Sequence, residues 1–270
     1  YASYLARVMF TREADWEQET PYTWDEAVTE TEDEDDDLAG AIVLNPVELD
    51  SVGVHDWTVI LDFEGLYPAV MCSYNTSHET KVRAGEPHLE DDMIGHRGIR
   101  FRKNPMGILP KMVTKLNEQR NAYKAKMAEA DAAGDDAGVK KWNTLQLSSK
   151  RMRASFYGIM AFDKFSWYDR DVAATITKGG RDSLLYIKKL AEEEGHRVVF
   201  GHTDSIFVTM PSEWSKEQVL AESERVCTLL TERIQEKLQS DAVVVDLEVI
   251  MDRFFIAKKN RYAGRKVWDD

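Results

Sequence analysis

The stretches WTVILDFEGLYP at residues 57–68 and RVVFGHTDSIFV at residues 197–208 decide the fold of this chain. In each stretch an apolar run, rich in β-branched and aromatic residues, leads to an aspartate, Asp62 in the first and Asp204 in the second. Such runs are typical of buried strands. Two carboxylates at strand ends, far apart in the chain, suit a shared divalent-metal site that stabilises an in-line phosphoryl displacement. We therefore expect these two carboxyl groups to meet around Mg²⁺.

The two aspartates also have a simpler interpretation, in which each one caps a turn at the end of a strand. Against it stands the cost of placing an uncompensated charge beside a buried strand. A bound Mg²⁺, which takes oxygen ligands, would offset that cost. The residues around both aspartates favour the metal interpretation.

Length and composition set the outer limits on fold and location. The 270 residues, 43% of them hydrophobic, suffice for one large domain or two smaller ones. No apolar run approaches ~20 residues, so we expect no membrane span. Cys72 and Cys227 offer neither metal-ligand spacing nor a disulfide framework, which favours a reducing cytoplasm. The chain begins at Tyr1 rather than Met, and we expect it to be a piece of a longer protein.

Charge is strongly segregated along the chain, although the net charge is −13. Basic residues concentrate in residues 97–126, 140–153 and 253–268, and these 60 residues carry +19 while the other 210 carry −32. Such segregation fits a groove for a polyanion on an otherwise acidic surface, with solvated basic faces as the alternative. The acidic excess is also consistent with adaptation to high salt, in which case activity should persist in molar KCl.

The order of expected elements indicates an α+β fold, in which helices cover one face of an antiparallel sheet. We expect an acidic segment or linker at residues 1–40, followed by strands over 41–44 and 57–63. Residues 108–133 and 139–161 have helical patterns separated by a Gly/Asp turn, which predicts a helical hairpin. A helix over 169–194, a β-hairpin over 197–210, a helix over 214–239 and a strand over 243–250 follow. Residues 76–106 read as an irregular excursion.

Several sequence motifs resemble those of family B DNA polymerases, in the order that the family has them. DFEGLYP at 62–68 and FGHTDS at 200–205 resemble motif A (D-x-x-S-L-Y-P) and motif C (Y-G-D-T-D-S). KRMRASFYG at 150–158 resembles motif B (K-x-x-x-N-S-x-Y-G), and EQRNAYK at 118–124 is similar to the family's fingers helix. FFIAKKNRYAG at 254–264 resembles the K-K-x-Y segment that grips the primer-template. The resemblance covers residues 41–266.

The resemblance implies a DNA-directed DNA polymerase fragment, in which 41–107 and 162–270 form the palm and 108–161 the fingers. Two Mg²⁺ ions, with Mn²⁺ as an alternative, would drive transfer of a deoxynucleotide to a primer 3′-hydroxyl. The implied partners are primer-template DNA, dNTPs and a sliding clamp, in the cytoplasm at the nucleoid. The implied site residues are Asp62, Phe63 and Asp204 for metal; Asp62, Asp204 and Lys150 for catalysis; Leu66, Tyr67, Arg120, Lys124, Lys150 and Tyr157 for nucleotide; and Gly158, Thr203, Lys259, Arg261 and Tyr262 for DNA.

The chain departs from the family pattern at three positions. His202 stands where motif C has its first aspartate, Ala154 replaces the asparagine of motif B, and Gly65 replaces a serine in motif A. Two alternatives to a DNA polymerase remain open, and the first of them follows from these changes. One is a catalytically degenerate, polymerase-like protein that binds DNA or acts as a scaffold. The other is a different two-metal phosphoryl enzyme, such as a nuclease. Glu248 is an additional candidate carboxylate near the metals.

Overall fold

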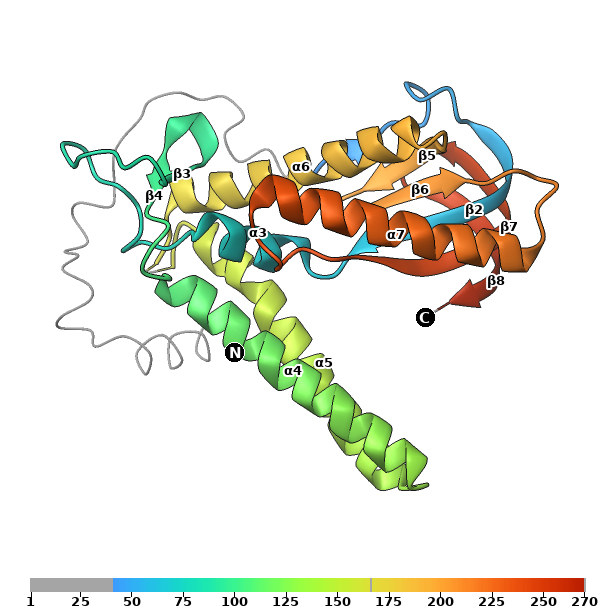
Figure 1. Cartoon of the computed structure of the whole chain (residues 1–270), viewed down its shortest axis with the longest axis horizontal. Coiled ribbons are helices and arrows are strands. Elements are labelled where there is room, and N and C mark those ends of the chain that lie inside the picture. The colour runs from blue at the N-terminus through green and yellow to red at the C-terminus, as the bar shows by residue number, and fades with distance from the viewer. Residues whose placement is uncertain (1–40, 166, 270) are drawn as a thin grey trace. The chain divides into compact units, whose positions relative to one another are not determined.

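The computed structural model describes residues 41–165 and 167–269 of the chain (Figure 1). Its contacts divide the described chain into two compact units. One unit comprises residues 74–176, and the other comprises the described residues up to Ser73 together with Thr177–Asp269. The acidic segment or linker expected at residues 1–40 lies outside the described residues.

The second unit is built on a six-stranded antiparallel sheet in the order β1-β5-β6-β2-β7-β8. Strand β2 occupies its centre, because it pairs with β6 on one side and with β7 on the other. The buried residues of β2 follow from its sequence, since Val59, Leu61 and Phe63 are at most 1% exposed. The strands are β1 (Val43–Leu44), β2 (Gly53–Phe63), β5 (Arg197–His202), β6 (Ser205–Thr209), β7 (Val245–Lys258) and β8 (Arg261–Asp269).

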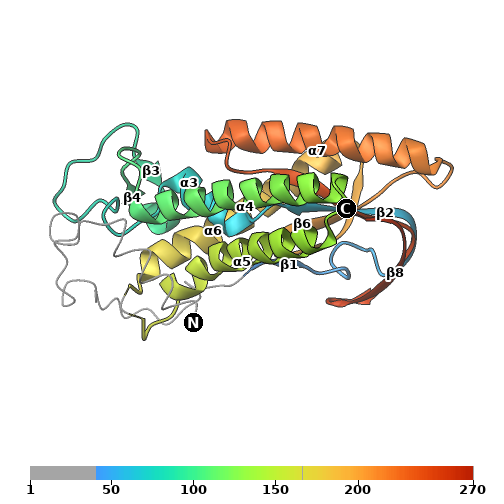
Figure 2. The same ribbon diagram turned by 90° about the horizontal axis from the view of Figure 1, so that it is seen from below.

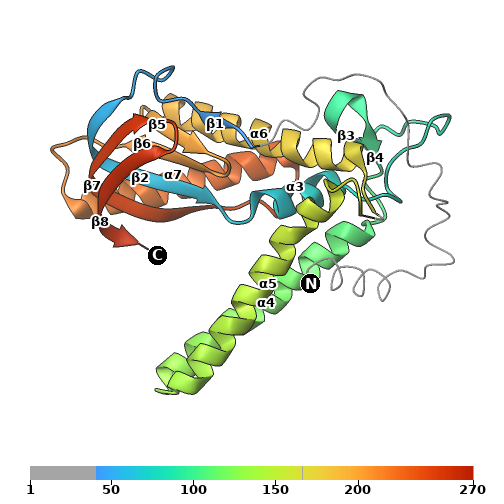
Figure 3. The ribbon, with the colours of Figure 1, turned by 180° about the vertical axis from the view of Figure 1, so that it is seen from behind.

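Two long helices cover one face of this sheet, α7 (Lys216–Leu238) and the part of α6 (Arg170–Glu193) from Thr177 onward, which belongs to this unit. Figure 1 shows both helices in front of the strands, and Figure 3 shows the strands in front of the helices. Ser215 begins α7 with a capping box, in which its side chain accepts from the backbone of Gln218 and the Gln218 side chain accepts from the backbone of Ser215. A third helix, α3 (Leu66–Tyr74), follows β2 after the turn at Glu64–Gly65.

The first unit contains the predicted helical hairpin, formed by α4 (Ile108–Ala132) and α5 (Asp136–Met160). The two helices run side by side in the views of Figures 2 and 3. Asp135 caps α5, because its carboxylate accepts a hydrogen bond from the Gly138 backbone N–H at 2.9 Å. Between α3 and α4 lie a small two-stranded sheet, β3 (Met93–Ile94) and β4 (Arg100–Phe101), and a 3-10 turn at His96–Gly98.

The structure confirms the predicted fold class, an antiparallel sheet with helices on one face and a helical hairpin. It differs from the sequence prediction in the C-terminal segment, where β7 is longer than expected and is followed by the unexpected strand β8. A two-residue turn at Lys259–Asn260 joins them, and Asn260 has a positive φ of 59°, a conformation that Asn adopts more readily than most residues. The expected irregular excursion at 76–106 also contains the short strands β3 and β4. Within the described ranges, no helix is long and apolar enough to cross a membrane.

Candidate functional site

Asp62 and Asp204 come from adjacent strand ends of the six-stranded sheet. Asp62 is the penultimate residue of β2 and pairs with Ser205, the first residue of β6. The backbone N–H of Phe63 donates to the backbone oxygen of Asp204 at 2.9 Å. Both aspartates are partly buried. The structure thus brings together the two predicted metal-binding segments, which are 142 positions apart in the chain.

The register of the sheet adds two polar residues to this strand end. Asp246 of β7 pairs with Asp62 on one side, and His202 of β5 pairs with Ser205 on the other. Because directly paired residues of antiparallel strands share a face, Asp246, Asp62, Ser205 and His202 form one row across four strands. Asp246 and His202 are both exposed. The row places three side chains of metal-ligating type on one face of the sheet.

Asp246 was not among the residues predicted from the sequence, where Glu248 was the suggested extra carboxylate. A register shift in the β2–β7 pairing falls between Ile60 and Leu61, so Val249 pairs with Ile60 and Leu247 with Leu61. Glu248 therefore has no partner in this register, whereas Asp246 is directly opposite Asp62. A sequence pattern gives the alternation of faces but not the position of a bulge, so the sequence alone could not choose between them.

The turn that carries Asp204 is a tight β-hairpin between β5 and β6. Thr203 has a positive φ of 56°, and its N–H donates to the backbone oxygen of Ile42 at 3.0 Å. The Thr203 hydroxyl lies 3.1 Å from Nδ1 of His202. This contact involves one ring nitrogen of His202 and fixes the ring beside the turn. The predicted DNA-binding residue Thr203 therefore lies within the same turn as the candidate metal ligand Asp204.

The donor types at this strand end fit a divalent cation. Asp62, Asp204 and Asp246 supply carboxylate oxygens, the ligands that Mg²⁺ prefers. Among the residues that the structure describes, no three His, Cys, Asp or Glu side chains converge into a group that could hold a metal ion. Proteins usually hold Mg²⁺ through one or two carboxylates together with substrate phosphates, so a pair of aspartates is a sufficient protein contribution.

Leu66 and Tyr67 follow β2 directly and form the first turn of α3. Leu66 is 3% exposed, and Gly65 precedes it with a φ of 72° that a residue with a side chain rarely adopts. Tyr67 is partly buried. A Cβ built at Gly180 of α6 would lie 2.8 Å from Cε1 of the Tyr67 ring, so the ring rests directly against this glycine.

Tyr262 of β8 packs on a cluster of three buried phenylalanines. Its ring centroid is 5.5 Å from Phe200, 5.3 Å from Phe207 and 5.6 Å from Phe254. The Tyr262 residue itself is 47% exposed, while the three phenylalanines are at most 2% exposed. The other two predicted DNA-binding residues of this segment, Lys259 and Arg261, are exposed at the β7–β8 turn. The β7–β8 hairpin thus presents two cations and one aromatic ring to solvent.

The predicted phosphate-binding residues of the helical hairpin differ in their surroundings. Arg120 of α4 is 8% exposed, and its Nε donates to Oε1 of Gln146 on α5 at 3.3 Å. Lys124 and Lys150 are exposed. Of the motif B residues, Tyr157 is partly buried and Gly158 is exposed, with nothing within 4 Å of a Cβ built on it. The hairpin offers exposed cations, while Arg120 helps hold its two helices together.

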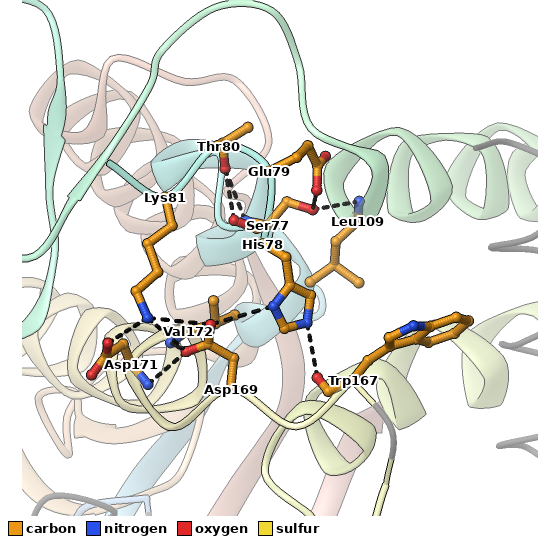
Figure 4. Close-up of polar contacts among 10 residues, drawn as sticks. All are labelled: Ser77, His78, Glu79, Thr80, Lys81, Leu109, Trp167, Asp169, Asp171 and Val172. Carbon is orange, nitrogen blue, oxygen red and sulfur yellow. Dashed lines mark hydrogen bonds and ion pairs between the residues drawn. The ribbon is translucent and has the colours of Figure 1, made fainter. Parts of the chain in front are cut away.

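A polar cluster in the first unit was not recognised from the sequence (Figure 4). His78 and Lys81 contact Asp169, whose carboxylate also accepts from the backbone N–H groups of Asp171 and Val172 at the start of α6. Burial alone would raise the pKa of Asp169. The hydrogen bond from His78, the charges of Lys81 and His78 and the Val172 N–H outweigh it and lower this pKa to about 2. Asp169 is therefore ionised in the folded protein at neutral pH.

Comparisons with known proteins agree with one another. The profile of DNA polymerase family B matches residues 17–270. The chain is 30% identical over 234 residues to "DNA polymerase 2" of Aeropyrum pernix, and 30% identical over 226 residues to "DNA polymerase" of Archaeoglobus fulgidus. These alignments cover 85% and 83% of this chain and 26% of each relative, so the chain spans about a quarter of their length.

A solved structure gives the same result. The chain matches the family B DNA polymerase from the hyperthermophilic archaeon Pyrobaculum calidifontis with a TM-score of 0.65 and 27% identity, over 90% of this chain and 30% of that one. The family profile covers well over half of the chain, and the strand ends that carry Asp62 and Asp204 are adjacent. This chain belongs to DNA polymerase family B.

Proposed function

We propose that the protein containing this chain carries out template-directed DNA synthesis, transferring a deoxynucleotide to the 3′-hydroxyl of a primer. The observation that carries the proposal is the adjacency of Asp62 and Asp204 in a chain of DNA polymerase family B. In this proposal residues 41–107 and 162–270 act as the palm and residues 108–161 as the fingers. The partners are primer-template DNA, dNTPs and a sliding clamp, and the protein works in the cytoplasm at the nucleoid.

Asp62 and Asp204 would hold the divalent ions through their carboxylates. Phe63, which follows Asp62 at the end of β2, would contribute its backbone oxygen. Two Mg²⁺ ions, or Mn²⁺ in their place, supply Lewis-acid stabilisation of charge at the reacting phosphate when bound. Asp246 adds a third negative charge on the same face of the sheet and would strengthen cation binding. Leu66 and Tyr67 would contact the incoming nucleotide through the first turn of α3, where helix N–H groups favour phosphate.

The helical hairpin would bind the triphosphate through Arg120, Lys124 and Lys150, because cations stabilise the charge that develops on the leaving pyrophosphate. Lys150 is also the candidate proton donor to that leaving group. Tyr157 would pack at the nascent base pair. These residues belong to the first unit, and the buried contact of Arg120 with Gln146 suggests that Arg120 also positions α5.

Primer-template DNA would be held by Gly158, Thr203, Lys259, Arg261 and Tyr262. Lys259 and Arg261 are exposed cations at a hairpin turn, which suits contacts to phosphates that carry no sequence information. Tyr262 adds a half-exposed aromatic surface beside them. Such contacts predict DNA affinity that falls steeply with increasing salt.

A second candidate function is a DNA-binding or scaffold protein that has lost catalysis. It is favoured by His202, which brings an imidazole instead of a carboxylate to the row beside Asp62. Imidazole is a poor ligand for Mg²⁺, which prefers oxygen. Ala154 further removes a polar side chain from motif B. Both candidates bind DNA through the β7–β8 hairpin, and they differ in whether nucleotides are incorporated.

Primer extension by the full protein separates the two candidates. We expect incorporation in Mg²⁺ or Mn²⁺, and we expect Asp204→Ala to lower the rate about a thousandfold, because metal stabilisation supplies several kcal/mol. Asp241→Ala, which removes an exposed aspartate of the loop before β7, is the matched control and should leave the rate unchanged. DNA binding without incorporation in either ion would support the scaffold, and cleavage of DNA without dNTPs would support a nuclease. A rate gain in His202→Asp would identify His202 as a partial lesion.

A further inference from the structure

Residues 75–81 connect the first turn of α4 to the start of α6, within the first unit. The N-cap of α4 is Gly107, which has no side chain to satisfy the free N–H groups of the first turn. Residues 75–81 provide the missing acceptors. Asn75 Oδ1 accepts from the Gly107 N–H at 2.8 Å, Ser77 Oγ accepts from the Leu109 N–H at 3.3 Å, and Glu79 Oε1 accepts from the Ile108 N–H.

The same residues contact the segment that begins α6. His78 Nε2 lies 2.9 Å from the backbone oxygen of Trp167, and Nδ1 lies 3.3 Å from Oδ2 of Asp169. Lys81 Nζ lies 3.3 Å from Asp169 and 2.5 Å from Asp171. Figure 4 shows His78 and Lys81 pointing toward Asp169, while Ser77 points toward Leu109 of α4. Neighbouring residues of one short segment therefore hold two different helices.

Asp169 extends this connection to the end of α5. Its backbone N–H donates to the backbone oxygen of Met160, the last residue of α5, at 3.2 Å. The hairpin thus has both of its ends tied to residues 75–81, α4 directly and α5 through Asp169. These two ends are far apart in sequence, at positions 108 and 160.

Residues 75–81 are themselves a compact block. Thr80 Oγ1 has the backbone oxygens of Asn75 and Ser77 within reach of its one O–H, at 2.5 and 3.0 Å, and accepts from the Ser77 N–H at 3.0 Å. Asn75, Ser77 and Thr80 are at most 5% exposed. Ser77 Oγ also donates to Glu79 Oε2 at 2.7 Å, which fixes the carboxylate that caps α4. Because the block is closely hydrogen-bonded and buried, a shift of one side displaces the other.

We propose that residues 75–81 form a brace that couples the two ends of the helical hairpin, with His78 and Lys81 as positioning residues for it. The brace deepens the proposed function, because the helical hairpin that it holds carries Arg120, Lys124 and Lys150. Its expected effect on nucleotide binding rests on that function. On its α6 side, Lys81 lies between the carboxylates of Asp169 and Asp171. Asp169 is 7% exposed, so loss of Lys81 or His78 leaves a buried carboxylate with fewer partners and loosens the start of α6.

Amide hydrogen exchange of the full protein tests the coupling without any enzymatic readout. His78→Ala and Lys81→Met change side chains that face α6, yet the brace predicts faster exchange at Ile108 and Leu109 of α4, by about tenfold. Lys81→Arg, which keeps the cation, should restore protection. Lys189→Met removes a cation on the exposed face of α6 and should change nothing at α4. Faster exchange confined to the start of α6 would overturn the brace.

Asp169→Asn is the second variant, because it keeps an acceptor for the Asp171 and Val172 N–H groups but removes the charge that Lys81 and His78 face. It should also speed exchange at Ile108 and Leu109, and unchanged exchange there would count against the brace.

In single-nucleotide incorporation, Lys81→Met should raise the KM for dNTP about tenfold with a smaller change in kcat. If the variants show the coupled exchange but the wild-type protein never incorporates nucleotide, the proposed function fails and the brace stands. Incorporation without coupled exchange gives the opposite result.

Discussion

Gly180 of α6 lies against the ring of Tyr67, with its built Cβ position 2.8 Å from Cε1 and 3.2 Å from Cδ1 of that ring. Contacts below 3.0 Å essentially never occur for a real Cβ, so an alanine at position 180 requires the ring to move. The ring is partly buried and joined to a helix that begins one residue earlier, which limits its freedom. The absence of a side chain at Gly180 therefore fixes where Tyr67 lies.

Gly180→Ala should weaken binding of the incoming nucleotide. We expect the KM for dNTP to rise about tenfold, because displacement of Tyr67 disturbs the proposed nucleotide contact. Steady-state single-nucleotide incorporation measures this change. Lys189→Ala, at an exposed position of the same helix, is the control and should leave the KM unchanged.

Thermal unfolding gives an independent check on the cause of that effect. Glycine to alanine in a helix interior normally stabilises a protein by about 1 kcal/mol. At position 180 the clash with Tyr67 should cancel this gain, whereas in a Tyr67→Ala background the gain should reappear. A full gain in the presence of Tyr67 would show that the ring yields without strain, and the proposed effect on nucleotide binding would then lose its basis.

Asp246→Asn should lower the rate of nucleotide incorporation by about 10- to 100-fold, the range seen when a residue supporting a metal site is replaced. The reason is the register that places Asp246 directly opposite Asp62 on the same face. Raising the Mg²⁺ concentration should recover part of the loss, because one negative charge near the cation is missing. Incorporation rates measured over a Mg²⁺ series, with Asp241→Asn as the control, test this expectation. Equal rates for the two variants would exclude a role for Asp246.

Tyr262 should contribute to stability through its ring and to DNA binding through its exposed edge. Tyr262→Ala removes three ring contacts and should lower the free energy of unfolding by about 2 kcal/mol. Tyr262→Phe keeps the ring and should unfold like the wild type in urea. Binding of primer-template DNA by the Phe variant then isolates the hydroxyl group, since the packing is preserved. A Phe variant as unstable as the Ala variant would contradict this assignment.

The sequence predicted most elements of the fold, because their patterns are local. The β5–β6 hairpin, for example, follows from apolar runs on both sides of a short turn, and both its strands were expected. The strand β8 was missed because residues 261–269 are almost entirely exposed and lack an alternating apolar pattern. Its role becomes visible only when Tyr262 is seen packed on Phe200 and Phe207.

The candidate site was predictable at Asp62 and Asp204, since each aspartate ends a strongly apolar run. It was not predictable at Asp246, whose pairing depends on a bulge that no residue pattern marks. For a related reason, the sequence predicts only an irregular excursion over residues 76–106 and gives no sign of the contacts that residues 75–81 make. Capping normally involves neighbouring residues, whereas Asn75 caps a helix that begins more than 30 positions later. Long-range caps of this kind leave no local signature.

Asp169 should make folding stability depend on pH in the acid range. Burial raises its pKa, but His78, Lys81 and the Val172 N–H lower it from the ordinary 3.8 to about 2. A carboxyl group with a depressed pKa in the folded state stabilises that state above its unfolded pKa, and the stabilisation is lost as the pH falls through about 2. The contribution at neutral pH is about 2 kcal/mol.

Urea unfolding of the wild type and Asp169→Asn between pH 6 and about pH 2 measures this contribution. Asparagine still accepts from the Asp171 and Val172 N–H groups, so the difference in unfolding free energy isolates the charge of Asp169. We expect that difference to be constant above the ordinary carboxyl pKa of 3.8 and to shrink steadily below it. Asp163→Asn, at an exposed position in the loop after α5, should show no such trend. A difference that stays constant down to the lowest pH would mean that the interactions of Asp169 with His78 and Lys81 do not stabilise its ionised form.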